Sequence, residues 1–316
     1  MPTIDLEKAA KVMQDFDKKT FNWAFKHISY KEKMDGSLNE LLQTNPNNII
    51  KFGWKLWDEK LWWIYWGKVY VVWWESWIWK STFVNKLSNS LSKQWIKVTK
   101  YSLEDRMQDI GKEDLFTYTN RERYKARQPL WNFVDFINNE YFHKSWKYYN
   151  ENNIQYLLRA KEILEMDNKN ITELDKLRQV NIEDMVKLME EEAKAWTKVF
   201  FIDHLHYFKK SWEQRMDLEI ENIMHDINEV CRKYNVAVFL LAHYRKLNNL
   251  EPSNDSFKDA SSIKQVANII IHISRDQNLT KFTFGKIRWK IKCKWFIGNY
   301  DIWTDSYVWF TEITEE

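Results

Sequence analysis

The sequence predicts an α/β fold whose core is a mainly parallel sheet flanked by helices. From about residue 49 onward, short apolar runs of strand length alternate with amphipathic stretches of helix length. Strands separated by helices are typical of parallel sheets joined by right-handed crossovers. The chain of 316 residues is long enough for one large domain with a small appendage.

The expected elements follow one another in a regular order. The pattern predicts strands at 68–72, 98–103, 198–203, 236–242 and 269–273. It predicts helices at 81–94, 182–195 and 213–234, a charged and mostly helical stretch at 105–195, and terminal strands in the last 35 residues. A breaker cluster at 44–48 separates a short helical N-terminal arm or linker, residues 1–48, from the main domain, residues 49–316.

Composition and charge exclude several classes of protein. The 48 basic and 45 acidic residues leave a net charge of +3, which does not by itself indicate a nucleic-acid binder. No apolar run approaches the ~18 residues of a transmembrane helix, and the first residues carry no signal core. Cys231 and Cys293 are the only cysteines, which excludes a disulfide framework. We therefore expect a cytoplasmic protein with no membrane partner.

The counts of tryptophan and glycine are abnormal. The chain has 19 Trp and 6 Gly, whereas average usage gives roughly 22 Gly in a chain of this length. Several tryptophans stand where turns, and therefore glycines, are expected: Trp62, Trp63, Trp66, Trp73, Trp74, Trp77 and Trp79. We hypothesise that the gene uses UGA for glycine and is written here with tryptophan, Trp131 being the best candidate for a genuine one. The alternative is a literal Trp-rich surface that binds sugars or bases.

A phosphate-binding motif emerges once glycine is restored. The segment 71–82 then reads VVGGESGIGKST and fits G-x-x-x-x-G-K-[ST] between a strand and a helix. Lys80 would neutralise phosphate charge and Ser81 would bind Mg²⁺; the alternative is a lysine that caps an ordinary helix. With literal tryptophans the loop predicts an inactive protein, because indoles disfavour positive φ and fill the space of the phosphates. The residues expected to contact nucleotide are Trp74, Glu75, Ser76, Trp77, Ile78, Trp79, Lys80, Ser81 and Thr82.

Two carboxylates follow later strands. Asp203 ends an apolar strand and is expected to hold Mg²⁺. Glu104 follows the strand at 98–103, and because the carboxyl ends of parallel strands line the ligand crevice, it could orient the attacking water. The alternatives are a solvated carboxylate at 104 and a metal pair formed by His204 and His206.

Six ordered segments resemble DnaB-type replicative helicases. Besides the phosphate-binding loop, they are 52–67, Ser102-Leu103-Glu104, 199–208, 238–245, 259–268 and Gly285–Trp289, the last of which resembles K-x-R-x-G. The resemblance covers roughly residues 49–310 and implies a RecA-like ATPase domain. Two departures are Lys264 in place of a usual Glu and Asn268 in place of a usual Asp.

This resemblance implies specific roles and partners. Glu104 would be the catalytic base, His243 would sense the γ-phosphate, and Lys286 and Arg288 would reach the ATP of a neighbouring subunit. The expected cofactors are ATP and Mg²⁺, and the expected partners are single-stranded DNA, further copies in a homo-hexamer and possible primase or loader proteins. A bacterial or phage origin follows from the same resemblance. Two rivals remain open: another RecA-like ATPase, such as a recombinase or a KaiC-like or RadA-like protein, and a non-enzymatic Trp-rich binding protein.

Overall fold

The structure is a computed structural model of the chain. It describes residues 29–43, 50–61, 64–74, 78–103, 107–175, 181–203, 216–243, 261–276, 279–287, 295–301 and 306–312. The chain divides into two compact units, Met1–Ile49 and Ile50–Glu316. In the first unit, α2 (Tyr30–Gln43) confirms a helix in the expected N-terminal arm. The second unit holds every other element described below.

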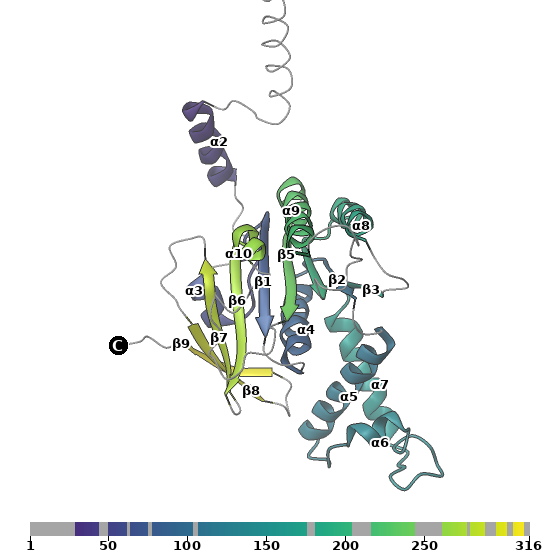
Figure 1. The fold of residues 1–316 in the computed structure, drawn as a ribbon. Coiled ribbons are helices and arrows are strands. Elements are labelled where there is room, and N and C mark those ends of the chain that lie inside the picture. Colours follow the sequence, from purple (N-terminus) through teal and green to yellow (C-terminus); the bar gives the residue numbers. More distant parts are fainter. Residues whose placement is uncertain are drawn as a thin grey trace, which may run out of the picture. The chain divides into compact units, whose positions relative to one another are not determined.

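Nine strands of the described chain form one sheet (Figure 1). In spatial order they are β3 (Ile171–Asp175), β2 (Val98–Ser102), β4 (Val199–Asp203), β5 (Ala237–His243), β1 (Lys68–Trp74), β6 (Ile269–Asp276), β7 (Leu279–Ile287), β8 (Trp295–Asp301) and β9 (Ser306–Glu312). The six strands from β3 to β6 pair in parallel, whereas β7, β8 and β9 extend the sheet in antiparallel fashion. The mainly parallel α/β fold predicted from the sequence is therefore confirmed.

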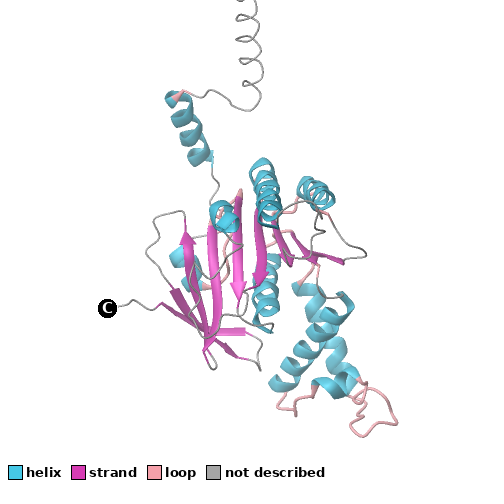
Figure 2. Cartoon of the chain, in the orientation of Figure 1, coloured by secondary structure: helices cyan, strands magenta, loops and turns pink. Residues whose placement is uncertain are grey.

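Helices cover both faces of the parallel strands (Figure 2). One face packs on α8 (Ile182–Lys194), α9 (Met216–Tyr234) and α10 (Ser261–Val266). The other packs on α3 (Lys55–Leu61) and α4 (Ile78–Lys93). In β1, Val69 and Val71 contribute to the first core and Tyr70 and Val72 to the second. A strand buried on both faces must be apolar throughout, which is why this run lacks polar alternation.

A helical insert lies between β2 and β3. It consists of α5 (Met107–Lys125), α6 (Phe133–Ile137) and α7 (Asn153–Asp167). The insert has its own aromatic cluster, in which Trp131 stacks on Tyr141 with ring centroids 4.6 Å apart. The Arg123 guanidinium lies 4.7 Å from the Trp131 ring centroid. Burial lowers the pKa of Arg123, and two neighbouring tyrosines act in the opposite direction.

The segment before β1 folds around one glycine and one aspartate. The Phe52 and Gly53 N–H groups donate to the two carboxylate oxygens of Asp58 at 2.6 and 3.1 Å. Gly53 has φ +84°, and a Cβ there would lie 1.8 Å from the Ser90 Oγ of α4. Burial raises the pKa of Asp58, although both N–H donors lower it. This glycine is needed both for its backbone conformation and for the close approach of α4.

Some sequence expectations are wrong in detail. Trp73 and Trp74 belong to β1 and Trp79 to the first turn of α4, so the turns expected at these three residues are absent. Trp131 precedes α6 instead of lying within a helix. The strand β3 was not expected inside the charged stretch 105–195, because its side chains are partly exposed at the edge of the sheet. Among the described helices, none is long and apolar enough to cross a membrane.

Candidate active site

The carboxyl ends of four neighbouring strands bring three of the expected site residues, Trp74, Asp203 and His243, to one edge of the sheet. In the register of β1 and β5, Trp74 lies opposite His243. In the register of β2 and β4, Ser102 lies opposite Asp203. These ends follow the strand order β2-β4-β5-β1. The crevice outside the carboxyl ends of parallel strands is where open α/β sheets bind ligands.

The phosphate-binding motif lies between a strand and a helix, as it requires. β1 ends at Trp74 and α4 begins at Ile78, so only Glu75–Trp77 stand between strand and helix, and they lie outside the described residues. Lys80 and Ser81 fall in the first turn of α4, as does Trp79. The first N–H groups of a helix have no intrahelical partner, and the helix dipole favours an anion there. A phosphate therefore fits this end of α4.

Asp203 and the end of β2 are held together by the backbone. The Leu103 N–H donates to the Asp203 carbonyl oxygen at 2.7 Å, which continues the pairing of β2 with β4 by one residue. Glu104 is the next residue along the chain and lies outside the described residues. The Asp203 residue itself is half-buried at the strand end. Its position suits a carboxylate that holds Mg²⁺ beside phosphates, as Mg²⁺ sites usually require one or two such ligands.

Lys286 lies at the other edge of the sheet. β7 runs antiparallel to β6, and Lys286 pairs with Ile270 near the start of β6. Ile270 in turn pairs with Val71, three residues before Trp74, which corresponds to about 10 Å along the strand. The Lys286 ammonium donates to the Gln265 carbonyl oxygen at 3.3 Å. The structure therefore does not bring Lys286 to the carboxyl edge, and Arg288 lies outside the described residues.

Asn268 has a structural position at the start of β6. Its side-chain oxygen accepts from the Val69 N–H at 2.9 Å, and its own N–H donates to the Val69 carbonyl oxygen at 2.9 Å. The residue is buried. The Asn268 side chain therefore fixes the start of β6 against β1, a role that the carboxylate oxygen of an Asp could also fill.

Two described tryptophans have backbone conformations that favour glycine. Trp95 follows α4 with φ +62°, and Trp196 follows α8 with φ +74°. Both are over 70% exposed. After each, the next residue donates its N–H five positions back: Ile96 to Leu91 at 3.1 Å and Thr197 to Glu192 at 3.0 Å. This 6→1 bond defines the Schellman motif, whose left-handed residue is usually glycine.

Other tryptophans are core residues. Trp57 is fully buried among aromatic rings, including Phe282 at 5.2 Å between centroids. Trp131 is buried in the helical insert. Trp73 is buried in β1, 5.4 Å from the His272 ring centroid. These five described tryptophans therefore fall into two groups with different structural requirements.

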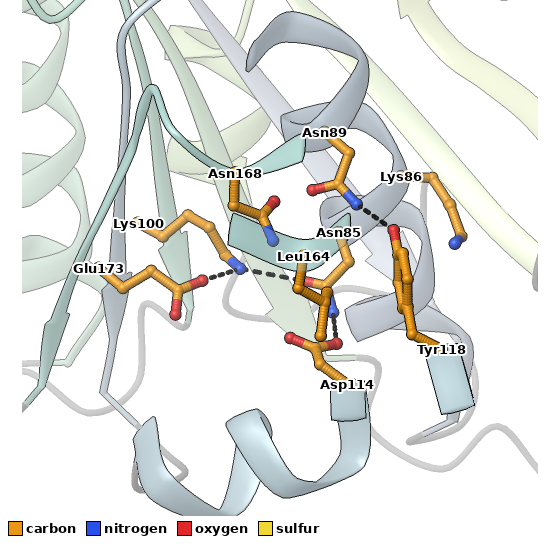
Figure 3. Close-up of a pocket in the computed structure, with 9 residues that line it drawn as sticks. All are labelled: Asn85, Lys86, Asn89, Lys100, Asp114, Tyr118, Leu164, Asn168 and Glu173. Carbon is orange, nitrogen blue, oxygen red and sulfur yellow. Dashed lines mark hydrogen bonds and ion pairs between the residues drawn. The ribbon is translucent and has the colours of Figure 1, made fainter. Parts of the chain in front are cut away.

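Sequence reasoning missed a polar cluster behind the carboxyl edge (Figure 3). Lys100 of β2 donates to the Asn85 side-chain oxygen of α4 at 2.9 Å and pairs with Glu173 of β3. Asn85 donates in turn to Asp114 of α5 at 3.2 Å. The only signal in the sequence was a lysine in the middle of an apolar strand. The two partners of Lys100, and Asp114 that binds one of them, lie on three other elements and could not be inferred from spacing.

The described part of the chain holds no group of three or more His, Cys, Asp or Glu side chains able to bind a metal ion. The proposed pair His204 and His206 lies outside the described residues. A magnesium site of the expected kind does not need such a group, because Ser81, Asp203 and the nucleotide phosphates would supply its ligands. The site residues therefore fit Mg²⁺ bound together with a nucleotide.

Comparison with known proteins gives a consistent fold. No family model and no curated protein matches the chain. Among solved structures, an ATPase domain has a TM-score of 0.69 and 16% identity, covering 90% of this chain and 99% of that one. The structure of a DnaB-like replicative helicase, described with its interactions with primase, also has a TM-score of 0.69 and 16% identity. The match covers 90% of this chain and 67% of the helicase. A KaiC-like protein from the archaeon Pyrococcus horikoshii has a TM-score of 0.51 and 13% identity, covering 85% of this chain and all of that one. The RecA-like ATPase fold expected from the sequence is thus confirmed.

Proposed function

We propose that this chain is the ATPase core of a DnaB-type replicative helicase, which hydrolyses ATP to move along single-stranded DNA. The observation that supports this most strongly is the alignment of Trp74, His243, Asp203 and Ser102 at the carboxyl ends of neighbouring strands. Each of these residues belongs to, or directly precedes, a motif with a separate role in phosphoryl transfer. The fold that the chain shares with a DnaB-like helicase supports the same proposal.

Each motif has a distinct role in this proposal. Lys80, in the first turn of α4, neutralises the β- and γ-phosphates, and Ser81 beside it binds Mg²⁺ together with Asp203. Glu104 accepts a proton from the attacking water. His243 at the end of β5 senses the γ-phosphate. Bound Mg²⁺ would screen the charge that develops on the phosphate oxygens.

The position of Lys286 supports a site shared between subunits. Lys286 lies near the amino edge of the same sheet whose carboxyl edge carries the phosphate-binding loop. A single chain therefore holds the two parts of the site about 10 Å or more apart along the strands. In a ring of identical chains, Lys286 and Arg288 can instead face the ATP of the next subunit. We propose a homo-hexamer with single-stranded DNA as its partner, in which phosphate contacts carry no sequence preference.

We also propose that glycine occupies several positions written as tryptophan. The exposed, left-handed residues Trp95 and Trp196 support this, since neither indole is buried and each backbone favours glycine. The codons at Trp74, Trp77 and Trp79 should then be UGA, and the codon at a genuine tryptophan should be UGG. Trp57 and Trp131, both buried, are the strongest candidates for genuine tryptophan. UGG at Trp74 and Trp79 would contradict the proposal.

A KaiC-like ATPase is the second candidate function, because a KaiC-like protein shares the fold at a lower TM-score. Both candidates would bind ATP at the same edge of the sheet. They differ in their response to DNA, because only a translocase couples its turnover to a bound strand. For the helicase we expect a protein of the bacterial cytoplasm or of a phage-infected cell. We expect primase or loader proteins as partners only if the protein is a helicase.

The experiment compares two forms of this 316-residue chain, one with tryptophan and one with glycine at positions 74, 77 and 79. We expect the glycine form to hydrolyse ATP with Mg²⁺ and to turn over faster when a single-stranded oligonucleotide is added. The tryptophan form should bind no nucleotide and serves as the control. Turnover that ignores DNA would favour the KaiC-like candidate. A glycine form that binds no ATP would reject the ATPase and favour a binding protein.

A further inference from the structure

The polar cluster around Lys100 joins the two elements that lead into the proposed catalytic residues. α4 begins at the phosphate-binding loop, and Asn85 lies one helical turn after Ser81. β2 leads towards Glu104, and Lys100 stands four residues before it. The hydrogen bond between Lys100 and Asn85 therefore joins α4 and β2 four residues away from Ser81 and from Glu104, the two residues expected to contact the same nucleotide.

The contacts of Lys100 are well defined. Its ammonium donates to the Asn85 side-chain oxygen at 2.9 Å and forms an ion pair with Glu173. The Lys100 side chain is only 14% exposed. Figure 3 shows Asn85 between Lys100 and Asp114, to which the Asn85 amide donates at 3.2 Å. One amide thus contacts β2 through its oxygen and the helical insert through its nitrogen.

Stability alone does not require this lysine. Val98 and Lys100 are two residues apart on β2 and so face the same side of the sheet, where Val98 is part of the apolar core beneath α4. The Lys100–Glu173 pair is partly exposed, because the Glu173 side chain is 32% exposed, and ion pairs of this kind usually contribute little to stability. A lysine at this position can form a directional hydrogen bond, which an apolar side chain cannot, and this bond fixes α4 relative to β2.

Further contacts of α4 hold the helical insert but do not reach β2. The Asn89 amide donates to the Tyr118 hydroxyl of α5 at 3.0 Å. Lys93 pairs with Asp167 of α7 at 2.8 Å, and its side chain is 56% exposed. These contacts share the helix and the partner region of Asn85, yet neither connects α4 to the strand of Glu104. They provide a natural comparison for the Lys100–Asn85 bond.

We propose that Lys100 and Asn85 are positioning residues for ATP hydrolysis. Their hydrogen bond sets the distance between the start of α4, which holds Ser81, and the end of β2, which leads to Glu104. This inference rests on the proposed ATPase function. A small displacement of reacting groups is enough to slow an enzyme about 100-fold, while nucleotide binding by the loop itself persists. The bond should therefore affect turnover and leave affinity nearly unchanged.

The test measures kcat and KM for ATP, and the affinity for Mg·ADP, in the full chain that carries glycine in the phosphate-binding loop. Lys100→Met should lower kcat about 10-fold or more and change KM and Mg·ADP affinity by less than about threefold. Lys93→Met is the matched control and should keep the kcat of the parent. Asn85→Leu removes the same bond from the helix side and carries the test if Lys100→Met does not fold. Lys100→Met also loses the pair with Glu173, and Asn85→Leu also loses the bond to Asp114. The double variant should nevertheless lose less than the product of the two single effects, since both variants remove the Lys100–Asn85 bond.

Three results would overturn the inference. Parent-like turnover in Lys100→Met or Asn85→Leu means that the bond does not position the reacting groups. An equal loss in Lys93→Met means that the insert, rather than the link to β2, is responsible. Multiplying effects in the double variant mean that Lys100 and Asn85 act separately. If the parent protein shows no turnover, the proposed ATPase function is itself rejected. This outcome differs from a failure of the positioning inference, which requires an active parent and is seen only when the variants are compared with it.

Discussion

Asn268 and Val69 exchange two hydrogen bonds, one through the Asn268 side-chain oxygen and one through its backbone N–H, both at 2.9 Å. The pair joins the start of β6 to β1 across 199 residues of chain. Because β1 leads directly to the phosphate-binding loop, this contact helps to anchor the strand that positions the loop.

We expect Asn268→Ala to lower the free energy of unfolding by about 1–3 kcal/mol, because the buried Val69 N–H loses its acceptor. Urea unfolding measures the change. Asn152→Ala is the control, since Asn152 is exposed and its side chain makes no capping hydrogen bond. That substitution should change stability by less than about 0.5 kcal/mol. Equal effects at the two sites would show that the Val69 contact contributes little.

Replacing tryptophan by glycine should have opposite effects at different positions. Trp196→Gly should raise the free energy of unfolding by about 1 kcal/mol, because glycine adopts the left-handed conformation without strain. Trp95→Gly should gain less, since the Trp95 ring lies 3.4 Å from the Lys169 ammonium. Trp57→Gly should lose about 4 kcal/mol by leaving a cavity among aromatic rings. A loss of stability in Trp196→Gly would contradict the assignment of glycine there.

Binding and turnover should separate at the carboxyl edge. In the glycine form, Lys80→Ala should abolish nucleotide binding, because the loop loses the charge that neutralises the phosphates. Glu104→Gln should bind Mg·ATP normally and lose turnover by about 100-fold or more, on the scale of a lost general base. Calorimetric binding and phosphate release measure the two properties separately. Normal turnover in Glu104→Gln would assign the base to another residue.

Arg288 should act on the neighbouring subunit. Arg288→Ala should bind ATP and assemble normally, yet turn over about 1,000-fold more slowly, on the scale of a lost arginine finger. Mixing it with Lys80→Ala should restore part of the activity, because an intact Lys80 site can then face an intact Arg288. Phosphate release from the mixture, compared with each parent, provides the measurement. Mixed rings that stay inactive would reject the role in trans.

The local parts of the fold were predictable and the non-local parts were not. The strand, loop and helix around Lys80 follow from a continuous sequence, and so does the apolar strand that ends in Asp203. β3 could not be predicted, because an edge strand with partly exposed side chains lacks the apolar signature of the buried strands. The prediction for Trp73 was wrong because the position was interpreted as a glycine in a turn. The structure instead places its ring in β1, beside the ring of His272.

The site shows the same division. A parallel sheet implies that Trp74 and His243 lie at the same edge, because each ends its strand, but only the structure shows that β1 and β5 are neighbours and that these two residues pair. The Lys100 cluster could not be predicted, because its members come from four elements and nothing in the spacing of Asn85, Asp114 and Glu173 links them. The same holds for Asn268, whose role depends on a strand 199 residues away.

The helical insert should unfold separately from the sheet. Its aromatic cluster around Trp131 is separate from both cores of the sheet, and amides, hydroxyls and ion pairs connect it to α4. Groups of residues with their own small core open at a lower free energy than the central strands of a domain. Amide protons of α5 and α7 should thus exchange with deuterium through a partial opening that leaves β1 and β5 intact. The protein then has two levels of cooperativity, and the insert is lost first as denaturant is raised.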